Sequence, residues 1–131
     1  MRLYTVEEAR DLLPVVVPVL EALRDSLAAL RRLRLAAAAN ARTATADGNL
    51  LADPWADEKT DPALALRKRA QDAHARLENW GIEVKDAERG LIDFYHERGG
   101  EVVYLCYLLG EPTIEYWHGL RSGFAGREPL P

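Results

Sequence analysis

The chain has 131 residues, one cysteine and a net charge of -4 at neutral pH. This length favours a single domain, 1–131, with its own hydrophobic core. One cysteine excludes an internal disulfide and is typical of a reducing compartment. The negative charge argues against holding nucleic acid through an overall positive field. No apolar run approaches the roughly 20 residues needed to cross a bilayer, and no signal-peptide core is present. We therefore expect a cytoplasmic protein that binds neither membranes nor nucleic acid.

Residues 6–40 predict helical structure in two pieces. Thr5 and Glu8 have the spacing of a capping box, which predicts a short helix over residues 6–13. Pro14 interferes with its continuation but suits the first turn of a second helix, which ends near Asn40. This second helix is amphipathic, because apolar residues recur at spacings of three and four: Val16, Val19, Leu20, Leu23, Leu27, Leu30 and Leu33.

Residues 41–60 have no apolar period and predict a connector loop, in which Trp55 is the one large anchor. The next helix, 61–80, begins with Asp61 as its cap and Pro62 in its first turn, and Gly81 closes it. Small residues dominate its apolar stripe, so it and the preceding helix are expected to pack closely as an antiparallel pair. The stripe consists of Ala63, Leu66, Ala70, Ala73, Leu77 and Trp80.

Residues 82–118 predict an antiparallel sheet, beginning with a short strand at 82–85. Gly99 and Gly100 lie between two alternating runs and supply the positive φ angles of a two-residue hairpin turn. This turn fixes the register of the two strands that it joins. The predicted pairs are Arg98 with Glu101, Glu97 with Val102, His96 with Val103, Tyr95 with Tyr104, Phe94 with Leu105, and Asp93 with Cys106.

A second turn at Gly110 leads into the last predicted strand. A turn of two or of four residues gives the same register, which places Glu115 opposite Cys106, Trp117 opposite Tyr104 and His118 opposite Val103. A slip of one residue would move His118 to the face that carries Asp93 and Cys106, because side chains alternate across a strand.

The predicted sheet has two faces of different character. The expected core face is apolar, with a histidine pair at one end: Ile92, Phe94, Val103, Leu105, Tyr107, Leu109, Ile114, Tyr116, His96 and His118. The other face mixes acids and aromatics: Leu91, Asp93, Tyr95, Glu97, Val102, Tyr104, Cys106, Leu108, Thr113, Glu115 and Trp117.

Residues 119–131 contain three glycines after His118 and two prolines, and predict an irregular C-terminal arm anchored by Phe124. The predicted fold is therefore α+β: a short N-terminal helix and an antiparallel helical hairpin pack on one face of a three- to four-stranded antiparallel meander. The arm either covers the outer face of this sheet or leaves it free for contact with another molecule.

Several short strings place the chain near a known family. The strings GIEVKD, GLIDF, VYLCYLLGE, IEYWH and GFAGREPL, together with the opening at 5–13, resemble the bacterial family of unknown function DUF2203. The resemblance implies a shared fold and a bacterial origin, and it implies no activity. The positions that match its pattern are Asp93, Cys106, Glu111, Trp117, His118 and Arg127.

The predicted register sets Asp93, Cys106 and Glu115 side by side on three neighbouring strands. Two carboxylates and a thiolate at a strand spacing of about 4.8 Å suit zinc or a similar divalent metal, with water as a fourth ligand. His118 joins this set if the last strand slips by one residue. Without a metal, the cysteine is a small core residue and the acids are solvated or paired with arginines.

Aromatic residues also line up across the three strands and are rimmed by acids. Such a surface suits a cationic or amphipathic ligand, a partner helix or a second copy of the chain, which predicts a homodimer. Its predicted members are Tyr95, Tyr104, Trp117, Asp93, Glu115 and Arg127.

An enzyme is the less favoured hypothesis. The sequence contains no phosphate-binding loop, dinucleotide fingerprint or serine triad, and an acid beside Cys106 disfavours the thiolate that nucleophilic catalysis requires. The leading hypothesis is thus a non-enzymatic ligand- or protein-binding module that uses the outer sheet face. The alternative is a divalent-metal protein, or a metal-dependent enzyme, built on Asp93, Cys106, Glu115 and His118.

Overall fold

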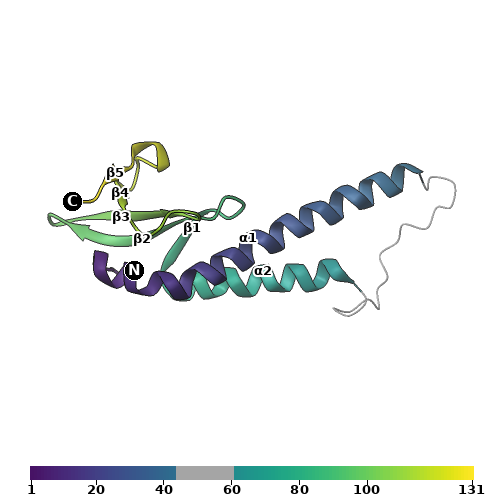
Figure 1. Ribbon diagram of the computed structural model, residues 1–131, viewed down its shortest axis with the longest axis horizontal. Helices are drawn as coiled ribbons and strands as arrows, with labels where there is room; N and C mark the ends of the chain where they lie inside the picture. The colour runs from purple at the N-terminus through teal and green to yellow at the C-terminus, as the bar shows by residue number, and fades with distance from the viewer. Residues whose placement is uncertain (44–60) are drawn as a thin grey trace.

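The computed structural model describes residues 1–43 and 61–131 and has an α+β architecture (Figure 1). Helices α1 (Val6–Thr43) and α2 (Pro62–Asn79) lie on one side of a five-stranded sheet of order β1-β2-β3-β4-β5. The predicted class is confirmed, but three to four strands was too few, because the C-terminal arm is not wholly irregular. It contains a 3-10 turn and the fifth strand. The remaining elements are β1 (Ile82–Asp86), β2 (Leu91–Arg98), β3 (Glu101–Leu108), β4 (Tyr116–His118), η1 (Phe124–Gly126) and β5 (Glu128–Pro129).

Helix α1 begins with the predicted capping box. The Glu8 amide donates to Thr5 Oγ1 at 3.0 Å, and the Thr5 amide donates to Glu8 Oε1 at 2.9 Å. The predicted break at Pro14 is wrong, because α1 runs unbroken through Pro14 and Pro18 to Thr43. Side chains on both sides of the first proline are buried, and burial of this kind outweighs the roughly 3 kcal/mol that an interior proline costs.

Helix α2 also has its predicted ends. Asp61 accepts a hydrogen bond from the Ala63 amide at 3.0 Å, and Gly81 follows the helix with a φ of 77°. Its buried residues are Ala70, Ala73 and Leu77, from the predicted stripe. The predicted connector at 41–60 is wrong at its first three residues, because 41–43 belong to α1. Its remainder, 44–60, including Trp55, lies outside the described residues.

The pairing of β2 with β3 is as predicted over its whole length. Gly99 and Gly100 have φ angles of 59° and 82°, and the pairs run from Arg98 with Glu101 to Asp93 with Cys106. Phe94 and Leu105 are fully buried against the helices. We call the face that packs on α1 and α2 the inner face, and the opposite face the outer face.

The predicted register of the last strand pair is wrong by one residue. Strand β4 pairs so that His118 faces Tyr104, Trp117 faces Leu105 and Tyr116 faces Cys106. Trp117 therefore packs against the inner core, whereas Tyr116 and His118 share the outer face with Cys106.

The turn explains this slip. The Leu108 amide donates to Glu111 Oε1 at 2.7 Å, and the Glu111 amide donates back to the Leu108 carbonyl at 3.0 Å. The Glu111 side chain thus closes the end of β3, and Ile114 turns into the core. The partner of Cys106 is consequently Tyr116, which lies one residue further along the chain than the predicted partner Glu115.

Within residues 1–43 and 61–131, no helix is long and apolar enough to cross a membrane.

Candidate metal centre

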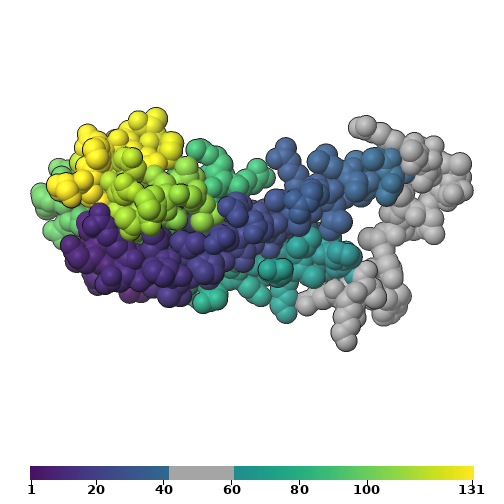
Figure 2. Space-filling model, viewed as in Figure 1, coloured from purple at the N-terminus to yellow at the C-terminus, as the bar shows by residue number. Residues whose placement is uncertain are grey.

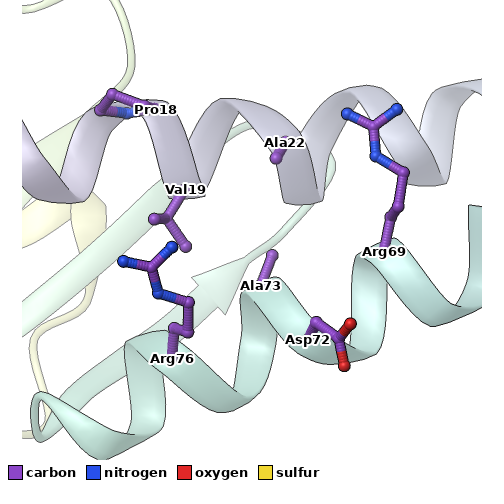
Figure 3. Close-up of a pocket in the computed structure, with 7 residues that line it drawn as sticks. All are labelled: Pro18, Val19, Ala22, Arg69, Asp72, Ala73 and Arg76. Atoms are coloured by element: carbon purple, nitrogen blue, oxygen red, sulfur yellow. The ribbon is translucent and has the colours of Figure 1, made fainter.

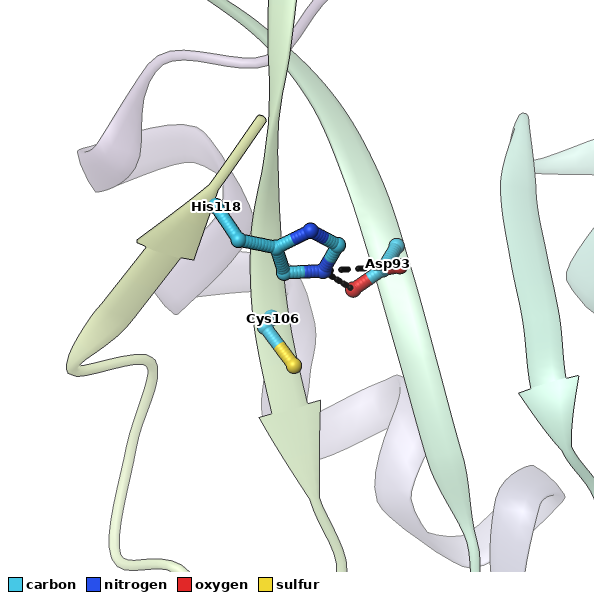
Figure 4. Close-up of side chains that lie close together, drawn as sticks. All are labelled: Asp93, Cys106 and His118. Carbon is cyan, nitrogen blue, oxygen red and sulfur yellow. Dashed lines mark hydrogen bonds and ion pairs between the residues drawn. The ribbon is translucent and has the colours of Figure 1, made fainter. Parts of the chain in front are cut away.

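Three neighbouring strands bring Asp93, Cys106 and His118 together on the outer face (Figure 4). Asp93 of β2 and Cys106 of β3 are direct partners, and the register of β4 adds His118 beside them. The carboxylate, thiol and imidazole donor atoms all lie within 4.8 Å of one another. We call these three residues the Asp-Cys-His cluster.

The cluster is buried although its members are polar. Asp93 and Cys106 are each 1% exposed, and His118 is 3% exposed. An isolated charge in such a place is strongly disfavoured, so the cluster requires compensation from within. His118 Nε2 lies 3.0 and 3.1 Å from the two Asp93 carboxylate oxygens.

The other ring nitrogen of His118 fixes how the ring is protonated. Nδ1 lies 2.8 Å from the Gly119 carbonyl oxygen, which can only accept a hydrogen bond. Nδ1 therefore carries a proton and donates it. Nε2 is left facing the Asp93 carboxylate and the Cys106 sulfur, where it binds a proton or another cation.

Burial controls the charge state of the two acidic members. It raises the pKa of Asp93 above its ordinary value, and the charge of His118 opposes this effect. Burial also raises the pKa of the Cys106 thiol to about 12, with a further contribution from the Asp93 charge. A cation bound between the two residues would favour their charged forms and so oppose both shifts.

A second polar group borders the cluster on the side of β1. The Tyr104 hydroxyl donates to Glu83, and Lys85 Nζ lies 3.1 Å from the same carboxylate and 4.4 Å from the Tyr104 ring centroid. The centroid of the Tyr104 ring lies 5.3 Å from that of the His118 ring and 5.1 Å from that of the Tyr95 ring, with the ring planes tilted by 51° and 46°. The hydrogen bond from Tyr104 holds the pKa of Glu83 below its usual range. This group forms one wall of the cluster.

The C-terminal arm forms the wall on the side of β4. Arg127 Nη2 lies 2.5 Å from Glu111 Oε2, and its guanidinium stacks over the Tyr116 ring at 3.9 Å and the Phe124 ring at 4.6 Å. The positive charge of Arg127 lowers the pKa of Cys106, against the larger effect of burial. The arm therefore acts electrostatically on the cluster that it borders.

The other predicted ligand, Glu115, is not part of the cluster. Its backbone carbonyl accepts the Leu130 amide at 2.8 Å, and the register slip moves its side chain off the face that carries Cys106. The same slip brings in His118, as the alternative register requires. The structure thus places three of the four candidate metal ligands together.

The members of the predicted aromatic surface are dispersed. Trp117 lies on the inner face, where the Arg98 guanidinium is 4.7 Å from its ring centroid. Tyr104 is buried, Tyr95 is half-buried beside it, and Arg127 pairs with Glu111. These residues do not form one open platform.

Sequence reasoning missed Glu83, Lys85 and the role of Glu111. The strand at 82–85 was predicted, but no tight turn fixed its register, so its pairing of Glu83 with Asp93 had no signal in the sequence. Glu111 was assigned only to a turn. Its side chain binds a strand amide with one oxygen and Arg127 with the other, and the sequence shows neither contact.

A separate groove of about 280 Å³ runs between the two helices (Figure 3). Its floor is alkyl, with Val19 from α1 and Ala73 from α2, and Arg69, Arg76 and Asp72 lie along its rim. It arises where small residues of α2 meet α1. The groove does not gather the metal-binding side-chain types found in the Asp-Cys-His cluster.

Fold and site together define a small α+β protein whose antiparallel sheet buries an Asp-Cys-His cluster on the face away from its helices. The chain belongs to the family described as "Uncharacterized conserved protein (DUF2203)", whose model matches residues 2–130. The resemblance seen in the sequence is confirmed. No curated protein and no solved structure matches the chain.

Proposed function

We propose that this protein binds a divalent metal ion of the zinc class through Asp93, Cys106 and His118. The observation that carries the proposal is the convergence of an oxygen, a sulfur and a nitrogen donor within 4.8 Å at a buried point. Cysteine, histidine and aspartate are the usual ligands of zinc.

The distances suit a zinc ion after small side-chain rotations. Zinc bonds of about 2.0–2.3 Å in tetrahedral geometry imply ligand separations of roughly 3.3–3.8 Å. The cluster spans up to 4.8 Å, and its His118 to Asp93 separation is 3.0 Å. The larger separation would have to shrink by about 1.0–1.5 Å and the smaller one to grow by about 0.3–0.8 Å. A mixed set containing a thiolate favours zinc over magnesium or calcium, which prefer oxygen ligands.

The hydrogen bond from His118 Nδ1 to the Gly119 carbonyl supports the same proposal. Metal-binding histidines donate their second ring nitrogen to a carbonyl or carboxylate, which orients the ring and fixes the tautomer. This arrangement presents the lone pair of Nε2 to the point where Asp93 and Cys106 converge.

The same geometry disfavours a cysteine nucleophile. In a catalytic relay, the nucleophile and the orienting acid bind opposite nitrogens of the histidine ring. Here both Asp93 oxygens face Nε2, the nitrogen on the Cys106 side, and Nδ1 is occupied by Gly119. Without a cation, burial also raises the pKa of the Cys106 thiol, and metal binding would have to displace this proton to form the thiolate ligand. We infer a metal-holding role in preference to nucleophilic catalysis.

The site's position suggests what the ion does. It would join β2, β3 and β4 at one point, and the slight exposure of its ligands leaves little room for a substrate. Water or another small ligand would fill the fourth position. We propose that the metal has a structural role and cross-links β2, β3 and β4 on the outer face of the sheet.

The predicted homodimer stays a prediction. It rested on Tyr104 and Trp117 as neighbours on an exposed surface, and these residues lie on opposite faces of the sheet. Light scattering of the wild type tests self-association independently of metal binding.

Elemental analysis of protein purified without an affinity tag tests the metal proposal. We expect about one zinc per chain in the wild type and loss of zinc in Asp93→Asn, Cys106→Ser and His118→Asn. Glu115→Gln is the matched control, because it also removes a nearby carboxylate but leaves the cluster intact, and it is expected to retain zinc. If the wild type contains no stoichiometric zinc even after incubation with zinc, the metal proposal is wrong and the cluster is a buried ion pair.

A further inference from the structure

The proposed metal site has no open route from solvent. Its three ligands are between 1% and 3% exposed, so an ion enters or leaves only when some covering element moves. The inner face offers no route, because Phe94 and Leu105 are fully buried beneath the helices.

The wall on the side of β1 is part of the sheet itself. Tyr104 belongs to β3, which is paired with β2 along its full length, and β2 is paired with β1 in turn. A backbone opening on this side would separate the central strands, which belong to the most stable part of a fold.

The C-terminal arm is attached far more lightly. Figures 1 and 2 show residues 119–131, in yellow, on the side of the sheet away from the purple start of α1. Strand β5 contributes two pairs, Tyr116 with Pro129 and Trp117 with Glu128, and one further backbone bond joins Leu130 to Glu115. Leu120 and Phe124 of the arm are exposed. Such a segment is the kind that opens locally while the rest stays folded.

Among the described residues, the Arg127–Glu111 ion pair joins the arm to the loop before β4, in addition to the packing of Leu130 on the core cluster and of the Arg89 guanidinium over the Phe124 ring. Glu111 is itself held by the Leu108 amide through one oxygen and binds Arg127 through the other. The two side chains are only 19% and 11% exposed, so water screens their attraction weakly.

The closed position of the arm also has an unfavourable contribution to its free energy. Arg127 Nε is buried without a hydrogen-bond partner among the described residues, and opening would return this donor to water. Against this cost, Arg127 holds the closed state through its ion pair with Glu111 and its stacking on the Tyr116 ring.

We propose that residues 119–131 form a lid over the Asp-Cys-His cluster and that the Arg127–Glu111 pair is the latch that sets how often the lid opens. For metal exchange, this inference rests on the proposed function. The lid itself is a property of the chain with or without metal.

Labelling of Cys106 in metal-free protein tests the lid directly, because Cys106 is the only cysteine of the chain. We expect a thiol reagent to modify Glu111→Gln about ten times faster than the wild type, since removing one partner of a buried pair strongly destabilises the closed state. Glu83→Gln is the matched control, because it breaks the ion pair on the opposite wall, and its labelling rate is expected to stay within about twofold of the wild type. Arg127→Lys, which keeps the charge but loses the planar fork, should fall between Glu111→Gln and the wild type.

Labelling that is equally fast in Glu111→Gln and the wild type, or faster in Glu83→Gln, would overturn the latch. Circular dichroism of each variant shows that it is folded before its rate is compared, and Arg127→Lys keeps the test open if Glu111→Gln does not fold.

Zinc exchange provides the second test. Transfer of zinc to a chromophoric chelator should be about tenfold faster from Glu111→Gln than from the wild type, and uptake should accelerate by a similar factor, because a gate changes both rates together. A change in the release rate alone would assign the Arg127–Glu111 pair to metal affinity and contradict the latch. The two proposals fail separately: a wild type that binds no zinc removes the metal site, whereas unchanged labelling of Cys106 removes the lid.

Discussion

The two faces of the sheet are closed by different means. The inner face is covered by two helices through apolar burial, with Phe94, Leu105 and Ile114 fully inaccessible. The outer face is bordered by a short arm and contains a buried acid, thiol and imidazole. Apolar burial contributes to stability without any cofactor, whereas buried ionisable groups contribute only when they are compensated. The comparison suggests that apolar burial on the inner face stabilises the fold without a ligand, whereas the stability of the outer face depends on a bound ligand.

Replacing Phe94 with alanine should give the largest effect on stability. The ring is fully buried and meets Tyr4 edge-on at 5.2 Å, so we expect a loss of about 3–5 kcal/mol in the free energy of unfolding. Denaturant titration measures it. The loss should be similar with and without zinc, because the inner face lies apart from the ligands; a zinc-dependent loss would break the distinction between the faces.

Zinc should raise stability through the outer face alone. At a free zinc concentration one thousand times the dissociation constant, binding to the folded state adds about 4 kcal/mol to the free energy of unfolding. Thermal unfolding with and without zinc measures this increase. Cys106→Ser should abolish it, and Glu115→Gln should retain it. An equal increase in Cys106→Ser would mean that zinc binds elsewhere.

The smallest expected effect concerns Glu83, on the wall beside the cluster. The Tyr104 hydrogen bond lowers the pKa of Glu83 from its ordinary 4.5, so its contribution to stability is present above pH 4.5 and is lost as the pH falls through the lower folded value. We expect Tyr104→Phe to raise the pKa of Glu83, which carboxyl NMR measures. The free energy of unfolding of this variant should approach that of the wild type as the solution becomes acidic. An unchanged pKa would show that Tyr104 does not set it.

Local signals in the sequence were sufficient for much of the fold. The Thr5–Glu8 capping box, Asp61–Pro62 and the Gly99–Gly100 turn each involve residues close in sequence, and each predicted structure is present. The Pro14 break failed because proline's local preference was outweighed by burial on both sides of it. That burial depends on the sheet and on α2, which local reasoning does not include.

The candidate site was only partly predictable for the same reason. The facing of Asp93 and Cys106 followed from a two-residue turn, whereas the position of His118 depended on a longer connection whose geometry is set by the Glu111 side chain. The Glu111 side chain accepts the Leu108 amide in place of a backbone carbonyl, and no residue spacing in the sequence indicates such a contact. The contact between Arg127 and Glu111 likewise required the arm's path to be known.

X-ray absorption at the zinc edge, on protein loaded with one equivalent of zinc, tests the central claim most directly. We predict one sulfur ligand at about 2.3 Å, from Cys106, and nitrogen or oxygen ligands at about 2.0–2.2 Å, from His118, Asp93 and a small fourth ligand. Zinc bound without a sulfur neighbour, or protein that takes up no zinc, would contradict the account.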